Sequence, residues 1–154
     1  MKHTQIIRKQ LIRSNIDDLW LFMSSPENLQ VITPKWMDFK ITSNNNKQKM
    51  YPGMIITYKV TPLLGIPLNW MTEITHITKH EIFVDEQRIG PYKIWHHQHI
   101  FEKKEDGILM TDIITYSLPF GLLGSLVNKL FVKKRVHKIF DYRNNIVEEI
   151  FNKK

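Results

Sequence analysis

The segment IWHHQHIF, residues 94–101, has two histidines at a spacing that places both on one face of a strand. Side chains alternate between the two faces of a strand, so His97 and His99 share a face with Trp95 and Phe101. An imidazole can transfer a proton near neutral pH, form hydrogen bonds or bind a metal. The pattern therefore predicts a polar site among aromatic side chains.

A second strand adds an acid and a phenol to this face. Asp106-Gly107 is a strong hairpin signal that joins the histidine strand to the next apolar stretch. If this dipeptide forms the loop, His97 pairs with Tyr116, and a slip of two residues instead puts His99 opposite Asp112. Asp112 and Tyr116 share the face of the histidines in either register.

An upstream stretch joins this group in only one loop geometry. Asp85 and Gln87 stand at alternating positions before the Gly90-Pro91 turn. If the loop has three residues, 89–91, these two side chains face the histidines, whereas a two-residue loop points them the other way. The residues alone leave both geometries open.

The group of His, Asp and Tyr side chains allows four interpretations. In the first it is structural, because a buried polar group without a partner costs about 1–3 kcal/mol. In the second it binds a carbonyl, hydroxyl or carboxylate of a small ligand. In the third Asp112 orients His97 or His99 for proton transfer. In the fourth these three residues bind zinc, but a His-x-His pair is a weak metal signal, so we expect no metal and no cofactor.

Arg143 interrupts the apolar face of a helix expected over residues 132–151. One interpretation is that its guanidinium extends to the rim of the fold or pairs with an acid such as Asp85 or Asp112. The alternative is that it anchors an anionic ligand head, because Arg forms bidentate bonds with carboxylates.

Strands and a long helix are needed to bring these side chains together. Helical spacing and turn signals predict short helices over residues 16–23 and 26–32, and a loop over 62–67. Period-two alternation predicts strands over residues 4–12, 36–41, 54–61, 68–78, 81–89, 92–103 and 108–118. The fold class expected from this order is α+β.

The C-terminal helical region has two distinct apolar faces. The apolar side changes near Phe131 and Val132, which predicts two helical pieces or a kink. The apolar segment 117–126 contains glycines and fits a lid, a packed connection or a transient contact with a membrane surface. The basic residues within 129–138 point around most of a helix, which favours a solvated surface over a phosphate-binding site.

The length of 154 residues predicts one domain over residues 1–154. The absence of cysteine excludes disulfides and thiolate chemistry. The start lacks the apolar core of a signal peptide and no apolar run is long enough to span a bilayer, so we expect a cytoplasmic protein. The net charge of +7 raises nucleic acid as a partner, but the basic residues are scattered and none is expected. The oligomeric state is left open.

The element order and two motifs resemble the SRPBCC or START-like superfamily, and in particular its bacterial ligand-binding, polyketide cyclase/dehydrase-like members. The motifs are Gln87-x-x-Gly90-Pro91-Tyr92-x-x-Trp95-x-His97-x-His99-x-Phe101 and Met110-x-Asp112-x-x-x-Tyr116-x-x-Pro119-x-Gly121-x-x-Gly124. The resemblance implies a helix-grip fold, in which a curved antiparallel sheet of about seven strands wraps a long C-terminal helix around an internal cavity. It also favours the three-residue loop.

These observations lead to functional hypotheses of different classes. The first is a carrier or sensor that binds a lipid-, sterol- or polyketide-like molecule. The second is a cyclase, dehydratase or hydrolase, with His97, His99 and Asp112 as candidate catalytic residues. The third is binding of an anionic membrane or a nucleic acid through residues 129–138. The side chains predicted to contact a ligand are Asp85, Gln87, Trp95, His97, His99, Phe101, Asp112, Tyr116 and Arg143.

Overall fold

The computed structural model describes residues 3–44, 49–63 and 65–153. Seven strands form one antiparallel sheet in the order β1-β7-β6-β5-β4-β3-β2. The strands are β1 (Thr4–Ile12), β2 (Lys40–Ile41), β3 (Ile55–Leu63), β4 (Ile66–Thr78), β5 (Ile82–Ile89), β6 (Ile94–Lys104) and β7 (Gly107–Ser117). The α-helices are α1 (Ile16–Met23), α2 (Gly121–Val127) and α3 (Lys133–Phe151).

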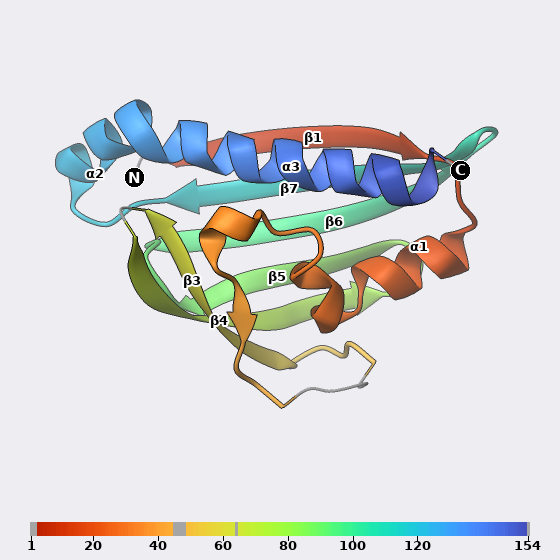
Figure 1. Ribbon diagram of the computed structural model, residues 1–154, viewed down its shortest axis with the longest axis horizontal. Helices are drawn as coiled ribbons and strands as arrows, with labels where there is room; N and C mark the ends of the chain where they lie inside the picture. The colour runs from red at the N-terminus through yellow and green to blue at the C-terminus, as the bar shows by residue number, and fades with distance from the viewer. Residues whose placement is uncertain (1–2, 45–48, 64, 154) are drawn as a thin grey trace.

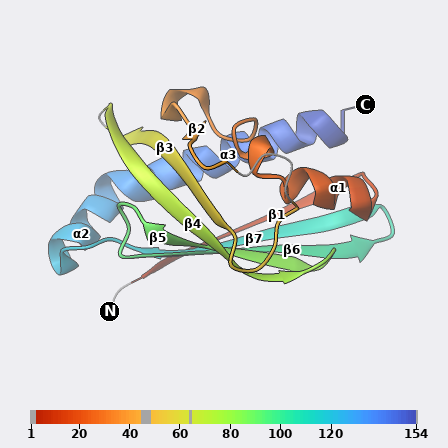
Figure 2. The same ribbon diagram turned by 90° about the horizontal axis from the view of Figure 1, so that it is seen from below.

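The sheet is strongly curved around α3. Figure 1 shows α3 lying along β1 and β7, while β3 and β4 turn away from these strands. Figure 2 shows the same curvature from below, with β3 and β4 crossing obliquely over the strands β6 and β7. This arrangement confirms the fold expected from the sequence, a curved sheet that wraps a long C-terminal helix.

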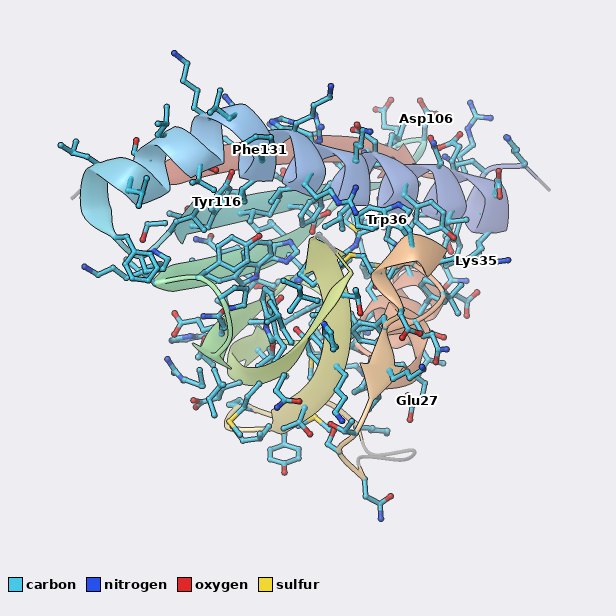
Figure 3. The ribbon with its side chains drawn as sticks, turned by 60° about the vertical axis from the view of Figure 1, so that its left-hand side comes forward. Glu27, Lys35, Trp36, Asp106, Tyr116 and Phe131 are labelled. Carbon is cyan, nitrogen blue, oxygen red and sulfur yellow. The ribbon has the colours of Figure 1, made fainter. Side chains whose placement is uncertain are left out.

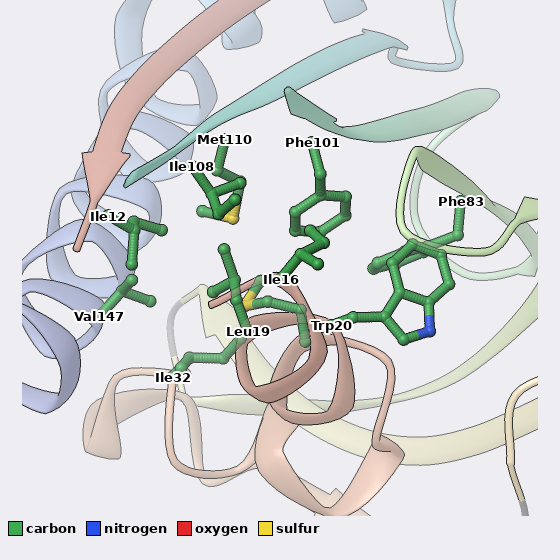
Figure 4. Packing of buried hydrophobic residues seen from close by; sticks show 11 residues of the cluster. Ile12, Ile16, Leu19, Trp20, Ile32, Phe83, Phe101, Ile108, Met110 and Val147 are labelled. Carbon is green, nitrogen blue, oxygen red and sulfur yellow. The ribbon is translucent and has the colours of Figure 1, made fainter. Parts of the chain in front are cut away.

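One end of the space between sheet and helix is filled by an apolar core. Leu19 and Trp20 of α1 pack with Phe101 of β6, Met110 of β7 and Val147 of α3 (Figure 4). The Trp20 and Phe101 rings meet edge to face with their centroids 5.5 Å apart. α1 therefore closes this end, and the polar residues of interest lie farther along the strands.

Three short segments differ from the sequence prediction. The helix expected over residues 26–32 is only a short 3-10 helix (Pro26–Leu29). Residues expected to form a strand from Trp36 onward instead form a 3-10 turn (Lys35–Met37), because Asp38 adopts a left-handed conformation with φ 43° and ends the extended pattern. The loop expected over residues 62–67 is not found in the described residues of that range. β3 and β4 continue into them and turn at Gly65, whose φ of 70° suits glycine.

The change of apolar face near Phe131 has a structural cause. A π-helical segment (Asn128–Val132) connects α2 and α3 without a break in the helical chain. A π turn contains more residues than an α turn, so the side-chain pattern shifts around the helix axis. Figure 1 shows an unbroken helical ribbon that changes direction between α2 and α3, so the kink is the alternative that fits this region and not two separate pieces.

The structure fixes the register between β6 and β7, one of the two that the sequence left open. Glu105 and Asp106 form the loop between β6 and β7, and Gly107 already pairs with Lys104. His99 therefore lies opposite Asp112, and the alternative that paired His97 with Tyr116 is wrong.

The register between β5 and β6 aligns the upstream acid with the histidines. Asp85 lies opposite His97, and Phe83 lies opposite His99. The connection is longer than the three residues expected, because β5 ends at Ile89 and β6 begins at Ile94.

Among the described residues, no helix is long and apolar enough to cross a membrane.

Candidate functional site

Two imidazoles lie side by side between two carboxylates in the middle of the sheet. The rings of His97 and His99 have centroids 3.8 Å apart. Asp85 of β5 approaches both rings from one side, and Asp112 of β7 approaches both from the other. The pairing of β5, β6 and β7 thus forms a closed group of four side chains, which we call the Asp–His ring.

The distances in the Asp–His ring distinguish the two histidines. His97 Nε2 lies 3.0 Å from Asp112 Oδ1 and its Nδ1 lies 3.3 Å from Asp85 Oδ2. His99 Nε2 lies 2.8 Å from Asp85 Oδ2. His99 Nδ1 also lies 2.9 Å from Asp112 Oδ1, but this contact lacks the alignment of a hydrogen bond with any described residue. The geometry fits a doubly protonated His97 and a His99 that carries its proton on Nε2.

The electrostatics agree with a protonated His97. Burial alone would raise the pKa of Asp85, but the charge of His97 and hydrogen bonds from both histidines hold that pKa well below its ordinary value. Burial opposes ionisation of Asp112 in the same way, and the hydrogen bond from His97 together with the close approach of His99 nevertheless lowers its pKa strongly. Burial would lower the pKa of His97, and the two carboxylates outweigh it and raise that pKa. His97 therefore holds its proton more tightly than a free histidine.

Aromatic side chains fix the orientation of the two imidazoles. Phe83 stacks on His99 with centroids 3.9 Å apart and an angle of 18° between the planes. Phe140 of α3 meets His97 edge-on at 5.2 Å. Rings packed in this way have few alternative rotamers, so the hydrogen-bond geometry of the Asp–His ring is rigid.

A cavity of about 120 Å³ lies between the inner face of the sheet, α3 and the segment between α1 and β2. Its wall is mainly aliphatic and aromatic, with Phe39, Trp70, Tyr92, Trp95 and Ile139 among the lining residues. The charged side chains that reach it are Asp85, His97, His99 and Arg143. An apolar space with a few converging polar groups is typical of a small-molecule site.

Arg143 lies in the apolar row of α3, as the sequence predicted. It is only 8 % exposed and shares its face of the helix with Val136, Phe140 and Val147. Its guanidinium carbon is 4.9 Å from the centre of the Phe140 ring. Neither Nε nor Nη1 has a hydrogen-bond partner among the described residues. The expected pairing of Arg143 with Asp85 or Asp112 is not formed among the described side chains, because the ion pairs of both carboxylates are with the histidines.

Most of the predicted ligand contacts reach the cavity or its immediate surroundings. Asp85, Trp95, His97, His99 and Arg143 line it. Asp112 lies behind the histidines, where it holds them through the contacts described above and does not line the cavity.

Three further predicted contacts do not line the cavity. Gln87 folds back on the β5–β6 connection, where its amide donates to the Tyr92 carbonyl and accepts from the Tyr92 N–H. Phe101 packs against α1 in the apolar core. Tyr116 donates a hydrogen bond to Asn128 Oδ1, and Figure 3 shows it beneath the helical segment that carries Phe131. A shared strand face was therefore not enough to predict a shared cavity, because the face is longer than the cavity.

Tyr58 is a lining residue that the sequence analysis missed. It forms a hydrogen bond of 2.9 Å with Thr72 Oγ1, and the Trp70 indole donates to the same oxygen. Burial raises the pKa of the Tyr58 phenol, so this group stays neutral. The available signal was alternation, because Ile56 and Val60 are buried on the same face.

One side of the Asp–His ring has an arrangement that could hold a metal ion. Asp85, His97 and His99 each offer a ligand atom, and these atoms lie within 4.8 Å of one another. Asp112 would then accept a hydrogen bond from the outer nitrogen of His97 and lie close to that of His99, as second carboxylates often do. The carboxylate that binds the metal would be Asp85, whereas the zinc site considered from the sequence had Asp112 as its carboxylate ligand.

Comparison with known proteins gives structural matches only. No protein-family model and no curated protein sequence matches the chain. A protein from Thermus thermophilus superposes with a TM-score of 0.71 at 14% identity, over 95% of each chain. The Panax ginseng major latex-like protein 151 gives 0.69 at 15% identity, over 97% of each chain.

A further structural match covers one part of a larger protein. The di-domain ARO/CYC StfQ from the steffimycin biosynthetic pathway has a TM-score of 0.66 at 9% identity, over 96% of this chain and 52% of StfQ. At such identities the likeness concerns the fold. The chain thus has the helix-grip fold that was expected from the resemblance, with a seven-stranded antiparallel sheet around a long C-terminal helix.

Proposed function

We propose that the protein binds a small apolar molecule in the cavity between the sheet and α3, as a carrier or sensor. The observation that carries this proposal is the composition of the cavity wall. Aromatic and aliphatic side chains form most of it, and the charged groups are confined to the Asp–His ring and Arg143. Apolar surface favours an apolar ligand body, and the few polar groups would orient it.

The volume limits the size of the ligand. Sites for drug-sized ligands measure about 300–1,000 Å³, whereas an engineered apolar cavity of about 150 Å³ accepts benzene. A cavity of about 120 Å³ thus suits a body of one ring. A lipid, sterol or polyketide requires the cavity to widen, for which the flexible side chains of Met23, Met37 and Met50 in its wall are suited.

The test uses a variant that fills the cavity. Native mass spectrometry of the purified protein, with solvent extraction, detects any molecule that it carries. Ethylbenzene and indole serve as added probes in thermal unfolding. A probe at 100 times its Kd should stabilise the fold by about 2.7 kcal/mol.

Ile139→Trp places a large ring in the cavity wall and should abolish both carriage and stabilisation. Lys138→Trp, one residue away on the exposed side of α3, is the matched control and should behave like the wild type. If no mass is carried and no probe stabilises the wild type more than Ile139→Trp, the proposal is wrong.

An acid–base enzyme is a second candidate. The observation that favours it is His97, which lines the cavity and bonds to the buried Asp112 at 3.0 Å. A histidine that keeps its proton in this way would act as a general acid. Once a substrate is found, Asp112→Asn should lower kcat at least about 100-fold while Kd changes little, because general acid catalysis contributes about 10²–10⁴. Unchanged kcat would contradict the enzyme candidate and leave binding unaffected.

A further inference from the structure

Arg143 is a buried cation, and two of its guanidinium nitrogens lack acceptors among the described residues. The side chain is 8 % exposed and lines the cavity, and its Nε and Nη1 have no hydrogen-bond partner among the described residues. Charges are rarely buried without a counter-ion, because removal from water is costly. This arrangement is therefore incomplete within the described part of the chain.

The two carboxylates of the Asp–His ring, which are candidates for a counter-ion, already have partners. Asp85 contacts both histidines at 2.8 and 3.3 Å, and Asp112 contacts both at 2.9 and 3.0 Å. The ion pairs of both carboxylates are thus with the histidines of the sheet. Phe140 contributes only its ring face to the guanidinium.

We infer that the ligand is a carboxylic acid with an apolar body of about one ring, and that its carboxylate pairs with the guanidinium of Arg143. A carboxylate supplies two acceptor oxygens and the opposite charge, whereas a ketone or alcohol supplies one oxygen and no charge. The body would lie against the aromatic wall, which includes Trp70, Tyr92 and Trp95. This inference rests on the proposed binding function and specifies the class of ligand.

The position of Arg143 on α3 explains how this one residue can select a ligand that carries a carboxylate. Arg143 stands in the same row as Phe140 and Val147, so its guanidinium enters the cavity from the helix, opposite the sheet that carries the Asp–His ring. A ligand whose carboxylate is held by the helix presents its ring to the strands.

The experiment compares ligands that differ only at the head. Phenylacetate, phenylacetamide and 2-phenylethanol are titrated by calorimetry into the full-length wild type and into Arg143→Met and Arg143→Lys. We expect phenylacetate to bind the wild type at least ten-fold more tightly than the amide. Arg143→Met should reduce this preference to less than two-fold, and Arg143→Lys should retain part of it because the charge is kept.

A purely structural role of Arg143 predicts different results. If the guanidinium serves only to hold the fold, Arg143→Met melts at a lower temperature, whereas our inference expects an equal or higher melting temperature without ligand. Equal affinity of acid and amide for the wild type overturns the inference while the binding function stands. If none of the three probes binds, and no carried molecule or neutral probe is found either, both fail together.

Discussion

At the scale of single residues, the Asp–His ring shows how two carboxylates are kept inside a sheet. Each acid contacts both imidazoles, so no described carboxylate of the ring is left without an opposite charge or donor. Removal of one partner from a buried ion pair costs about 3–5 kcal/mol, because the other charge is then left alone. The four side chains therefore depend on one another, and changes in two of them will not be additive.

The raised pKa of His97 predicts how stability depends on pH. Its contribution is complete below the unfolded value of 6.5 and is lost as pH rises through the higher folded pKa. The contribution of Asp85 and Asp112, whose folded pKa values are lowered, is present above 3.8 and is lost as pH falls. The unfolding free energy should thus be greatest between these limits and should fall above them by up to about 1.4 kcal/mol per pH unit.

Urea unfolding between pH 5 and about 9 measures this slope. The His97→Gln variant is the comparison, since it removes the group while other histidines still titrate. His137 works in the opposite sense, because burial and the charge of Arg8 lower its pKa. A wild-type-minus-variant difference that does not change with pH would show that His97 is not protonated in the fold.

The residue types of the site could be predicted better than their contacts. Alternation placed His97 and His99 on one face, and helical spacing placed Arg143 on the apolar row. The residue opposite His99 was left open by the sequence. Moving the β6–β7 loop by one residue along the chain shifts the pairing of the two strands by two positions. The unsatisfied guanidinium nitrogens could not be predicted, because they depend on both acids being engaged elsewhere in three dimensions.

At the scale of elements, the β6–β7 hairpin aligns the site, and Gly107 makes this hairpin fit. Its φ is 144°, and a Cβ at this position would lie 2.3 Å from the carbonyl oxygen of Ile12. Ile12 pairs with Ile108 in the ladder between β1 and β7. The hairpin and the end of β1 can approach this closely only because Gly107 has no side chain.

Gly107→Ala should therefore destabilise the protein more than an ordinary glycine substitution. Gly53 is the matched control, because its φ is 88° and no described atom lies within 4 Å of an added Cβ. We expect Gly53→Ala to cost about 1–2 kcal/mol from backbone strain alone. Gly107→Ala should cost at least about 1 kcal/mol more, because the displaced group is backbone. Equal midpoints in urea would contradict this account.

The elements themselves were largely predictable, and the exceptions are local. Strong alternation and the turn signals located the long strands to within a few residues. The segment 36–41 alternates as well, but it turns at Asp38 and only Lys40–Ile41 joins the sheet. Around Gly65 the prolines and the glycine favoured a loop in the sequence, whereas β3 and β4 form a tight hairpin there. A short pattern does not distinguish a strand from a turn when a single residue takes a left-handed conformation.

At the scale of the whole molecule, one surface is unusually apolar. Large side chains of the α2 region are exposed, with Leu122 at 92 % and Phe120 at 81 %. Leu123, Leu126, Leu130 and Phe131 are exposed beside them, together with Lys129 and Lys133. Apolar and basic side chains on one exposed helix are typical of segments that lie on anionic lipid.

This surface predicts weak binding to anionic membranes. In sedimentation with vesicles, wild type should bind phosphatidylcholine containing phosphatidylglycerol more strongly than phosphatidylcholine alone. Replacing both Leu122 and Leu126 by Glu should weaken binding at least about ten-fold, a change of about 1.4 kcal/mol. Both side chains are exposed, so the melting temperature should stay unchanged. Equal binding to both vesicles, or by both proteins, would contradict the prediction.

The π-helical segment Asn128–Val132 rotates the side-chain pattern of α2 about the helix axis relative to that of α3. Upstream of it the leucines face outward, and downstream the row of Val136, Phe140 and Val147 faces the sheet. Deleting one residue there would return this helical region to a uniform α-helix and rotate α2 by about 100° relative to α3. The outer surface and the cavity wall can therefore be reoriented against each other by a change in chain length alone, with every side chain of the wall retained.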